Sequence, residues 1–106
     1  MALKRWNIAN FGTGGTGSTQ TLMTAAASKE TILLSLLISN YSTEDAANIT
    51  VTHTDGTSTI FQFKGTIRSG NSPMAIDSKI VLEPADVISI TSDNDDVAVL
   101  ASGDES

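Results

Sequence analysis

The stretch TILLSLLIS, residues 31–39, decides how the rest of the chain is interpreted. Ile32, Leu34, Leu36 and Ile38 alternate with Leu33, Ser35, Leu37 and Ser39, so a β-strand would place the two sets on opposite faces. The first set is wholly aliphatic, and the second set is half apolar. We therefore expect a central strand that is buried on at least one face, with Leu34 and Leu36 in the core.

A β-hairpin is predicted downstream of this strand. In Asn48–Thr54, apolar residues and His53 alternate with threonines, which is typical of a half-buried strand. The dipeptide Asp55-Gly56 offers the backbone conformations that a tight hairpin turn requires. The segment Thr57–Lys64 would then return as the partner strand.

Three further short strands follow, at residues 80–82, 87–91 and 97–101, separated by polar turns at 69–73, 83–86 and 92–96. We expect residues 103–106 to form a solvated polar tail. Short strands at near-regular spacing favour an all-β, antiparallel β-sandwich of jelly-roll or immunoglobulin-like type, with about 7–8 strands. One alternative stays open at Thr21–Ile32, where helix propensity would allow about two helical turns.

The N-terminal region has a different composition. Residues 12–19 read GTGGTGST, and glycine resists regular structure because it loses the most entropy on ordering. We therefore expect an extended Gly/Thr-rich arm at residues 1–20 and a single sandwich domain at residues 21–106. The arm carries Leu3, Trp6, Ile8 and Phe11, which we predict to be an assembly interface with a neighbouring subunit, the chain's own sandwich being the alternative.

Composition excludes several classes of protein. A chain of 106 residues has room for one domain, and without cysteine it has neither disulfides nor thiolate metal sites. A net charge of −6 and scattered basic residues argue against nucleic acid as a partner. No apolar run approaches the roughly 20 residues of a membrane-spanning helix, and the N-terminus does not resemble a secretory signal. We expect synthesis in the cytoplasm and no membrane partner.

Two glycine patterns in the N-terminal region imitate nucleotide-binding motifs. Gly12, Gly14 and Gly17 match the spacing of the dinucleotide fingerprint, and Gly12 and Gly17 nearly match a P-loop. The fingerprint requires a strand before it and a helix after it, whereas the rest of this chain is β-like. In the P-loop pattern, Ser18 stands where the phosphate-binding lysine belongs. No cofactor is expected.

The candidates for metal binding and catalysis are few. His53 is the only histidine, so a metal site would depend on carboxylates. The acidic turn Asp93–Asp96 lacks the glycine and the distal glutamate of a calcium loop, although cation binding there stays open. There is no cysteine and no nucleophile elbow, and the carboxylates of Asp77, Glu83 and Asp86 fall in or near predicted turns. We expect no catalytic residues, no metal site and no enzymatic activity.

Residues 30–102 resemble a group of small virion proteins of tailed bacteriophages. The shared pattern is a hydrophobic strand ending in asparagine, a Thr/Val-rich hairpin, a segment of the form KIVL-x-x-x-D-x-I-x-I and a last strand ending near a serine. Here these are Ile32–Asn40, Ile49–Phe63, Lys79–Ile90 and Asp96–Ser102. A glycine often precedes the aspartate in such segments, and here Ala85 stands there.

This resemblance implies a non-enzymatic accessory role in a virion, as a capsid decoration or cement protein or a neck or collar component. The expected partners are further copies of the chain and capsid, neck or tail subunits, and the expected location is the virion, after synthesis in the host cytoplasm. The alternatives are a tail, baseplate or fibre-attachment module, or a receptor- or carbohydrate-binding β-sandwich. Position, copy number and symmetry in the particle stay open.

Overall fold

The computed structural model describes residues 3–70 and 73–106, which form nine β-strands and no helix. The strands are β1 (Leu3–Ile8), β2 (Ser18–Thr24), β3 (Thr31–Asn40), β4 (Ala47–Thr54), β5 (Thr59–Ile67), β6 (Met74–Ile76), β7 (Ile80–Leu82), β8 (Val87–Ser92) and β9 (Val97–Glu105). The helix that residues 21–32 could have formed is absent, because β2 and a turn occupy most of that segment.

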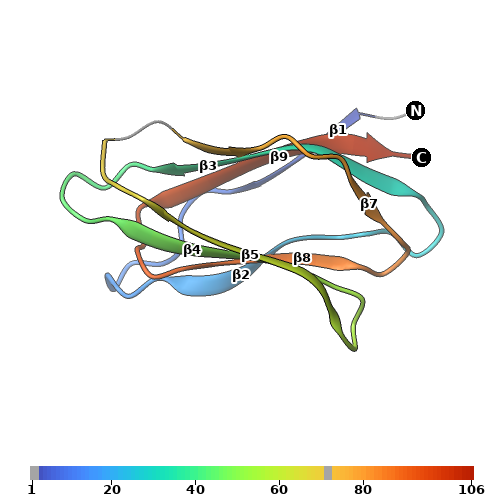
Figure 1. The fold of residues 1–106 in the computed structure, drawn as a ribbon, viewed down its shortest axis with the longest axis horizontal. Helices are drawn as coiled ribbons and strands as arrows, with labels where there is room; N and C mark the ends of the chain where they lie inside the picture. The colour runs from blue at the N-terminus through green and yellow to red at the C-terminus, as the bar shows by residue number, and fades with distance from the viewer. Residues whose placement is uncertain (1–2, 71–72) are drawn as a thin grey trace.

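The strands form two sheets that pack face to face (Figure 1). Sheet A has the order β1-β9-β3-β6, with β7 also pairing with β3, and sheet B has the order β2-β8-β4-β5. Every strand pair is antiparallel. The predicted all-β antiparallel sandwich is therefore confirmed, with nine described strands where about 7–8 were expected from the turn spacing.

The central position of β3 is confirmed, but its facing is only partly as predicted. The strand pairs with β9 on one side and with β6 and β7 on the other. A β-bulge between Leu33 and Ser35 adds one residue, which reverses the alternation at that point. Leu36 is buried, at 1% exposure, whereas Leu34 is 41% exposed. The predicted burial of Leu34 is wrong, because Leu33 takes the inward position instead.

The predicted hairpin between β4 and β5 is present, but its turn spans residues 55–58, so the return strand is Thr59–Ile67 in place of Thr57–Lys64. Gly56 has a φ of 97°, in the left-handed region that favours glycine. The Asp55 carboxylate accepts hydrogen bonds from the backbone N–H groups of Thr57 and Ser58, at 2.9 and 2.8 Å. These bonds stabilise the ionised carboxylate and lower the pKa of Asp55 to about 2. The turn therefore carries a negative charge at any pH above that value.

The structure shows no separate N-terminal arm. Residues 3–8 form β1, which pairs with β9 along its whole length, and residues 18–24 form β2, which pairs with β8. The glycine-rich composition is confined to the loop between β1 and β2, which belong to opposite sheets. Residues 1 and 2 of the predicted arm, and residues 71 and 72 of the predicted turn, lie outside the described residues.

The expected polar tail is also part of the sandwich. Strand β9 continues to Glu105, which is buried and forms an ion pair with Lys4 of β1 at 3.0 Å. Ser106 and Glu30 exchange two backbone hydrogen bonds of 2.9 Å. The predicted solvated tail is wrong because residues 103–105 continue the pairing of β9 with β1 and β3. The backbone at Gly103 and the side chain of Glu105 are buried there, while Ser102 and Asp104 lie on the opposite face.

The core lies between the two sheets and takes side chains from both. Apolar burial of this kind is the main favourable term in folding. Its buried hydrophobic residues are Ile8, Phe11, Leu22, Met23, Ala25, Leu33, Leu36, Ile38, Ala47, Ile49, Val51, Ile67, Leu82, Ile88, Ile90, Val97, Val99 and Ala101.

Candidate functional site

The outer face of sheet A carries most of the exposed large hydrophobic side chains of the described residues. Five of the eight exposed large hydrophobic side chains among the described residues lie on it, with exposures from 37% to 75%. Their outward direction follows from strand alternation, because their strand neighbours are mostly buried. These five residues, which we call the apolar face, are Leu3, Leu34, Leu37, Val81 and Leu100.

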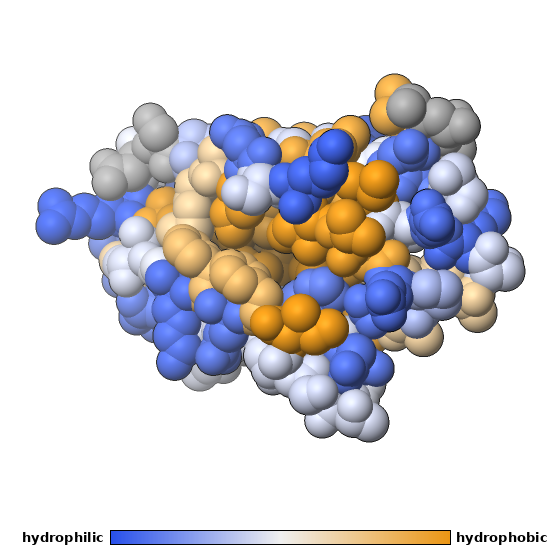
Figure 2. All heavy atoms as spheres, turned by 45° about the vertical axis from the view of Figure 1, so that its right-hand side comes forward, coloured by the Kyte–Doolittle hydropathy of each residue, from blue (hydrophilic) through white to orange (hydrophobic). Residues whose placement is uncertain are grey.

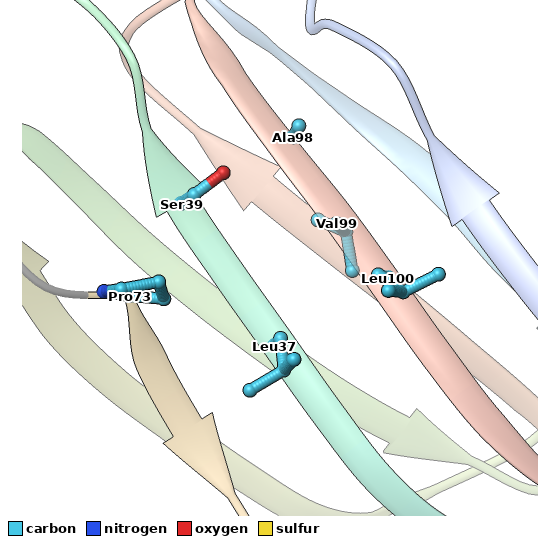
Figure 3. A pocket seen from close by; sticks show the side chains of 6 residues that line it. All are labelled: Leu37, Ser39, Pro73, Ala98, Val99 and Leu100. Carbon is cyan, nitrogen blue, oxygen red and sulfur yellow. The ribbon is translucent and has the colours of Figure 1, made fainter.

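A shallow hollow of about 200 Å³ lies on this face. In Figure 3, Leu37 and Ser39 project from β3, Ala98 and Leu100 project from β9, and Pro73 borders the hollow where the chain enters β6. Among the described residues, no charged side chain lines it. Leu37 and Leu100 pair directly across the two strands, and an exposed apolar patch with polar side chains around it typically marks a contact with another macromolecule.

The outer face of sheet B has the opposite character. On β4, Thr50 and Thr52 alternate with buried Ile49 and Val51, so the threonines face outward. Ser89 and Thr91 of β8 and Thr19 and Thr21 of β2 continue this hydroxyl-bearing surface, because they pair across the strands with one another. The hydroxyls of Thr19 and Thr91 lie 2.7 Å apart. Large apolar side chains are therefore exposed on the outer face of sheet A, among polar ones such as Arg5 and Ser102, whereas hydroxyl side chains dominate the outer face of sheet B.

An open side of the sandwich lies between β5 and the β6–β7 edge. Phe61, Ile76, Ser78 and Ile80 line a cleft of about 260 Å³ there. Figure 2 shows apolar side chains gathered in the middle of the side on which β7 lies, with hydrophilic ones around them. Further along β5, Gly65 allows the Met74 side chain to pack closely against the strand. A Cβ at position 65 would overlap the end of the Met74 side chain.

The glycine-rich loop holds a carboxylate of its own chain. The backbone N–H groups of Gly15 and Gly17 donate to the two oxygens of Asp95, the second at 2.8 Å. Asp95 is 8% exposed, and its carbonyl oxygen accepts a hydrogen bond from the N–H of Phe11. Successive N–H groups directed at one anion resemble the backbone nests that bind phosphate. In this loop, however, those N–H groups are occupied by Asp95.

We expect the Asp95→Ala variant to lose about 2–3 kcal/mol of stability, because two backbone N–H groups would lose a charged acceptor. The measurement is urea denaturation, together with amide exchange at Gly15 and Gly17, which should accelerate. Asp96→Ala is the matched control, since Asp96 is exposed and adjacent. Equal losses in both variants would contradict the role assigned to Asp95.

His53 forms a buried pair with Asp86. Its Nε2 lies 2.9 Å from Oδ2 of Asp86, and both residues are at most 5% exposed. The same carboxylate oxygen accepts a 3.0 Å hydrogen bond from the N–H of Glu83. The His53–Asp86 contact therefore links β4 to the turn between β7 and β8. In this turn Ala85 has a φ of 71°, a conformation in which glycine would be unstrained.

The residues of the acidic turn have separate hydrogen-bonding partners. Asp93 accepts hydrogen bonds from the backbone N–H and the side-chain amide of Asn48, at 2.8 and 2.7 Å, while Asp95 faces the glycine loop. Within residues 3–70 and 73–106, no three acidic or histidine side chains are placed to share a metal ion. The same part of the chain has no helix that could cross a membrane.

The four predicted interface residues are not brought together on one surface. Leu3 is 75% exposed on the apolar face, and Trp6 is partly buried against the core. Ile8 and Phe11 are buried in the core, so their side chains cannot contact a neighbour. The exposed residues Leu37, Val81 and Leu100 were not among the predicted interface residues. The alternation in residues 31–39 placed Leu37 on the face opposite Leu36, and this pattern was the available indication of its exposure.

Comparison with known proteins gives no assignment: no family model, no curated protein and no solved structure matches this chain.

Proposed function

We propose that this chain is a non-enzymatic structural subunit that attaches to a larger assembly through the apolar face of sheet A. The observation that carries the proposal is the contrast between the two outer faces: Leu37, Val81 and Leu100 are exposed on one, and hydroxyl side chains cover the other. Docking would bury the apolar face and leave the hydroxyl-rich face of sheet B in water.

The energy available from this surface is modest for one copy. Fully burying a leucine or valine side chain contributes about 1.5–3 kcal/mol, and these side chains are already about half buried. Three or four of them would together contribute a few kcal/mol, from which the cost of association must be subtracted. Such a contact is effective when many copies bind a repeating surface, because multivalent attachment multiplies weak contacts.

The proposed assembly is the virion of a tailed bacteriophage, with the chain as a capsid decoration protein or a neck component. This part of the proposal is supported by the resemblance of residues 30–102 to small phage virion proteins. The hairpin and the segment from Lys79 to Ile90, which carry much of that resemblance, form β4–β5 and β7–β8. The proposed partners are further copies of the chain and other virion subunits.

The test is mass spectrometry of purified particles of the phage that encodes the chain. The expected result is that its peptides co-purify with intact particles in fixed stoichiometry. Hundreds of copies would indicate a shell or sheath position, and about a dozen would indicate the neck or baseplate. Absence of the chain from intact particles would contradict the virion assignment.

A variant pair tests the surface itself. Leu100→Glu places a charge at the centre of the apolar face and should reduce co-sedimentation with particles at least 10-fold, without changing the melting temperature by more than a few degrees. Thr21→Glu places the same charge on the outer face of sheet B and should leave co-sedimentation unchanged. If both variants bind as the parent does, sheet A is not the docking face.

A further inference from the structure

The sandwich has four edges, and three of them carry features that discourage pairing with another chain. The β1 edge presents Lys4 and Arg5, and the β2 edge is distorted by a bulge between Thr21 and Met23. The third edge is divided between β6 and β7, of three residues each. The fourth edge, β5, is nine residues long and carries one charged residue, Lys64. Its own bulge, at Ile60, lies near the hairpin end and leaves residues 61–67 regular.

We propose that β5 pairs antiparallel with β5 of a second copy of this chain, about a two-fold axis at Phe63. The four strands of sheet B in each copy would then form one continuous sheet across the dimer. An exposed strand edge is a template for such pairing, because its backbone N–H and C=O groups lack partners on one side.

The sequence of β5 is self-complementary in this register. Phe63 is the midpoint of Thr59–Ile67, so residues 61–65 pair in regular register with their symmetry mates and the bulge at Ile60 lies toward each end of the overlap. Phe63 would lie opposite Phe63 of the second copy, and Phe61 would lie opposite Gly65. Aromatic pairs directly opposed on two antiparallel strands stabilise their pairing.

The neighbouring registers are less favourable. Directly opposed residues in an antiparallel pair lie on the same face of the sheet, so the two strands can shift only in steps of two residues. The smallest shifts move the two-fold axis by one residue, to Gln62 or to Lys64. An axis at Lys64 would place two lysines directly opposite each other, which is destabilising. An axis at Gln62 would shorten the overlap and bring the bulge at Ile60 toward its centre.

The charge distribution also favours a second copy at this edge. The chain has a net charge of −6, yet β5 contains no acidic residue. Beyond the bulge at Ile60, Arg68 lies near the turn 55–58 of the second copy, where the Asp55 carboxylate is exposed. Opposite charges would therefore meet at both ends of the shared strand pair, and the acidic repulsion between the two copies would be reduced there.

The expected dimer is weak. An edge-to-edge strand contact is narrower than a standard protein interface of roughly 1,600 Å², although it would also cover part of the apolar cleft beside Phe61. The inference deepens the proposed assembly function by naming a self-contact in addition to the docking face. It is tested on the purified chain without particles, so its failure and the failure of the virion assignment can be distinguished.

The test changes charge at Gln62, an exposed residue that would lie opposite Lys64 of the second copy. Gln62→Lys creates two Lys–Lys pairs per dimer and should raise the dimer Kd about 2- to 30-fold. Gln62→Glu creates two Glu–Lys pairs and should lower the Kd by a similar factor. The double variant Gln62→Lys with Lys64→Glu should restore dimerisation. Sedimentation equilibrium over a concentration series gives the Kd, and chemical denaturation confirms that each monomer is folded.

Leu100→Glu distinguishes this contact from self-association through sheet A. It should leave the dimer Kd unchanged, because Leu100 lies on the other sheet. A chain that stays monomeric at millimolar concentration would overturn the inference. It would also be overturned if Gln62→Lys and Gln62→Glu shifted the Kd equally, or if Leu100→Glu alone abolished the dimer.

Discussion

Replacing Phe11 with alanine is expected to lower the free energy of unfolding by about 3–5 kcal/mol, which is a large part of the stability of a domain this size. Phe11 is fully buried, at 0% exposure, although it lies in the loop that follows β1. Truncation would leave a cavity between the two sheets that the surrounding backbone can fill only in part. Urea denaturation of the parent and the variant measures the difference.

A truncated chain extends this test. Removing residues 2–17 deletes β1, Phe11 and the loop that binds Asp95, so we expect the remainder to show no cooperative unfolding transition. Leu3→Ala serves as the control, because Leu3 is 75% exposed and its loss should cost less than about 1 kcal/mol. A folded truncated domain of unchanged stability would mean that residues 2–17 act as a separate arm.

The second large effect is expected on β3. Leu36→Ala should cost about 2–5 kcal/mol, because Leu36 is 1% exposed at the centre of sheet A. Leu34→Ala should cost less than about 1 kcal/mol, because Leu34 is 41% exposed. The two variants remove the same atoms from the same strand, so the difference in their urea midpoints isolates burial.

This pair also tests the bulge between Leu33 and Ser35. Without the bulge, Leu34 and Leu36 would share a face and their alanine variants would have similar costs. Leu33→Ala should behave like Leu36→Ala, since Leu33 is 1% exposed. Equal costs for Leu34 and Leu36 would place both in the core and contradict the register of β3 on β9.

Local patterns were enough to predict most of the sandwich. The hairpin β4–β5 and the strands β7 and β8 were identified because alternation and turn residues act over a few positions. The bulge at Leu34 could not be predicted, since it depends on the pairing of Leu33 with Gly103 and of Ser35 with Ser102 of β9, near the other end of the chain. β1 was missed for the same reason, because the strand is defined by its pairing with β9 at the other end of the chain.

The candidate site was harder to predict than the fold. The apolar residues near the N-terminus indicated a segment that is buried against another surface, but Ile8 and Phe11 are buried in the core of their own domain. The exposed positions Leu37 and Leu100 could not be distinguished from core residues by hydrophobicity alone. Deciding which face of β3 and β9 is outside requires the position of sheet B, which no local pattern supplies.

The order of the strands has a consequence for how the chain acquires its structure. Among the described strands, only β4 and β5 pair with a neighbour in sequence, whereas β1 and β3 pair with β9, and β2 pairs with β8. Closing such long loops before contacts form makes folding slow, in the range of milliseconds to seconds for all-β topologies. During synthesis, β1, β2 and β3 leave the ribosome before β8 and β9 exist. The apolar residues of these three strands therefore stay exposed until β8 and β9 have been synthesised. Rapid high-level expression should for this reason favour aggregation over the native sandwich.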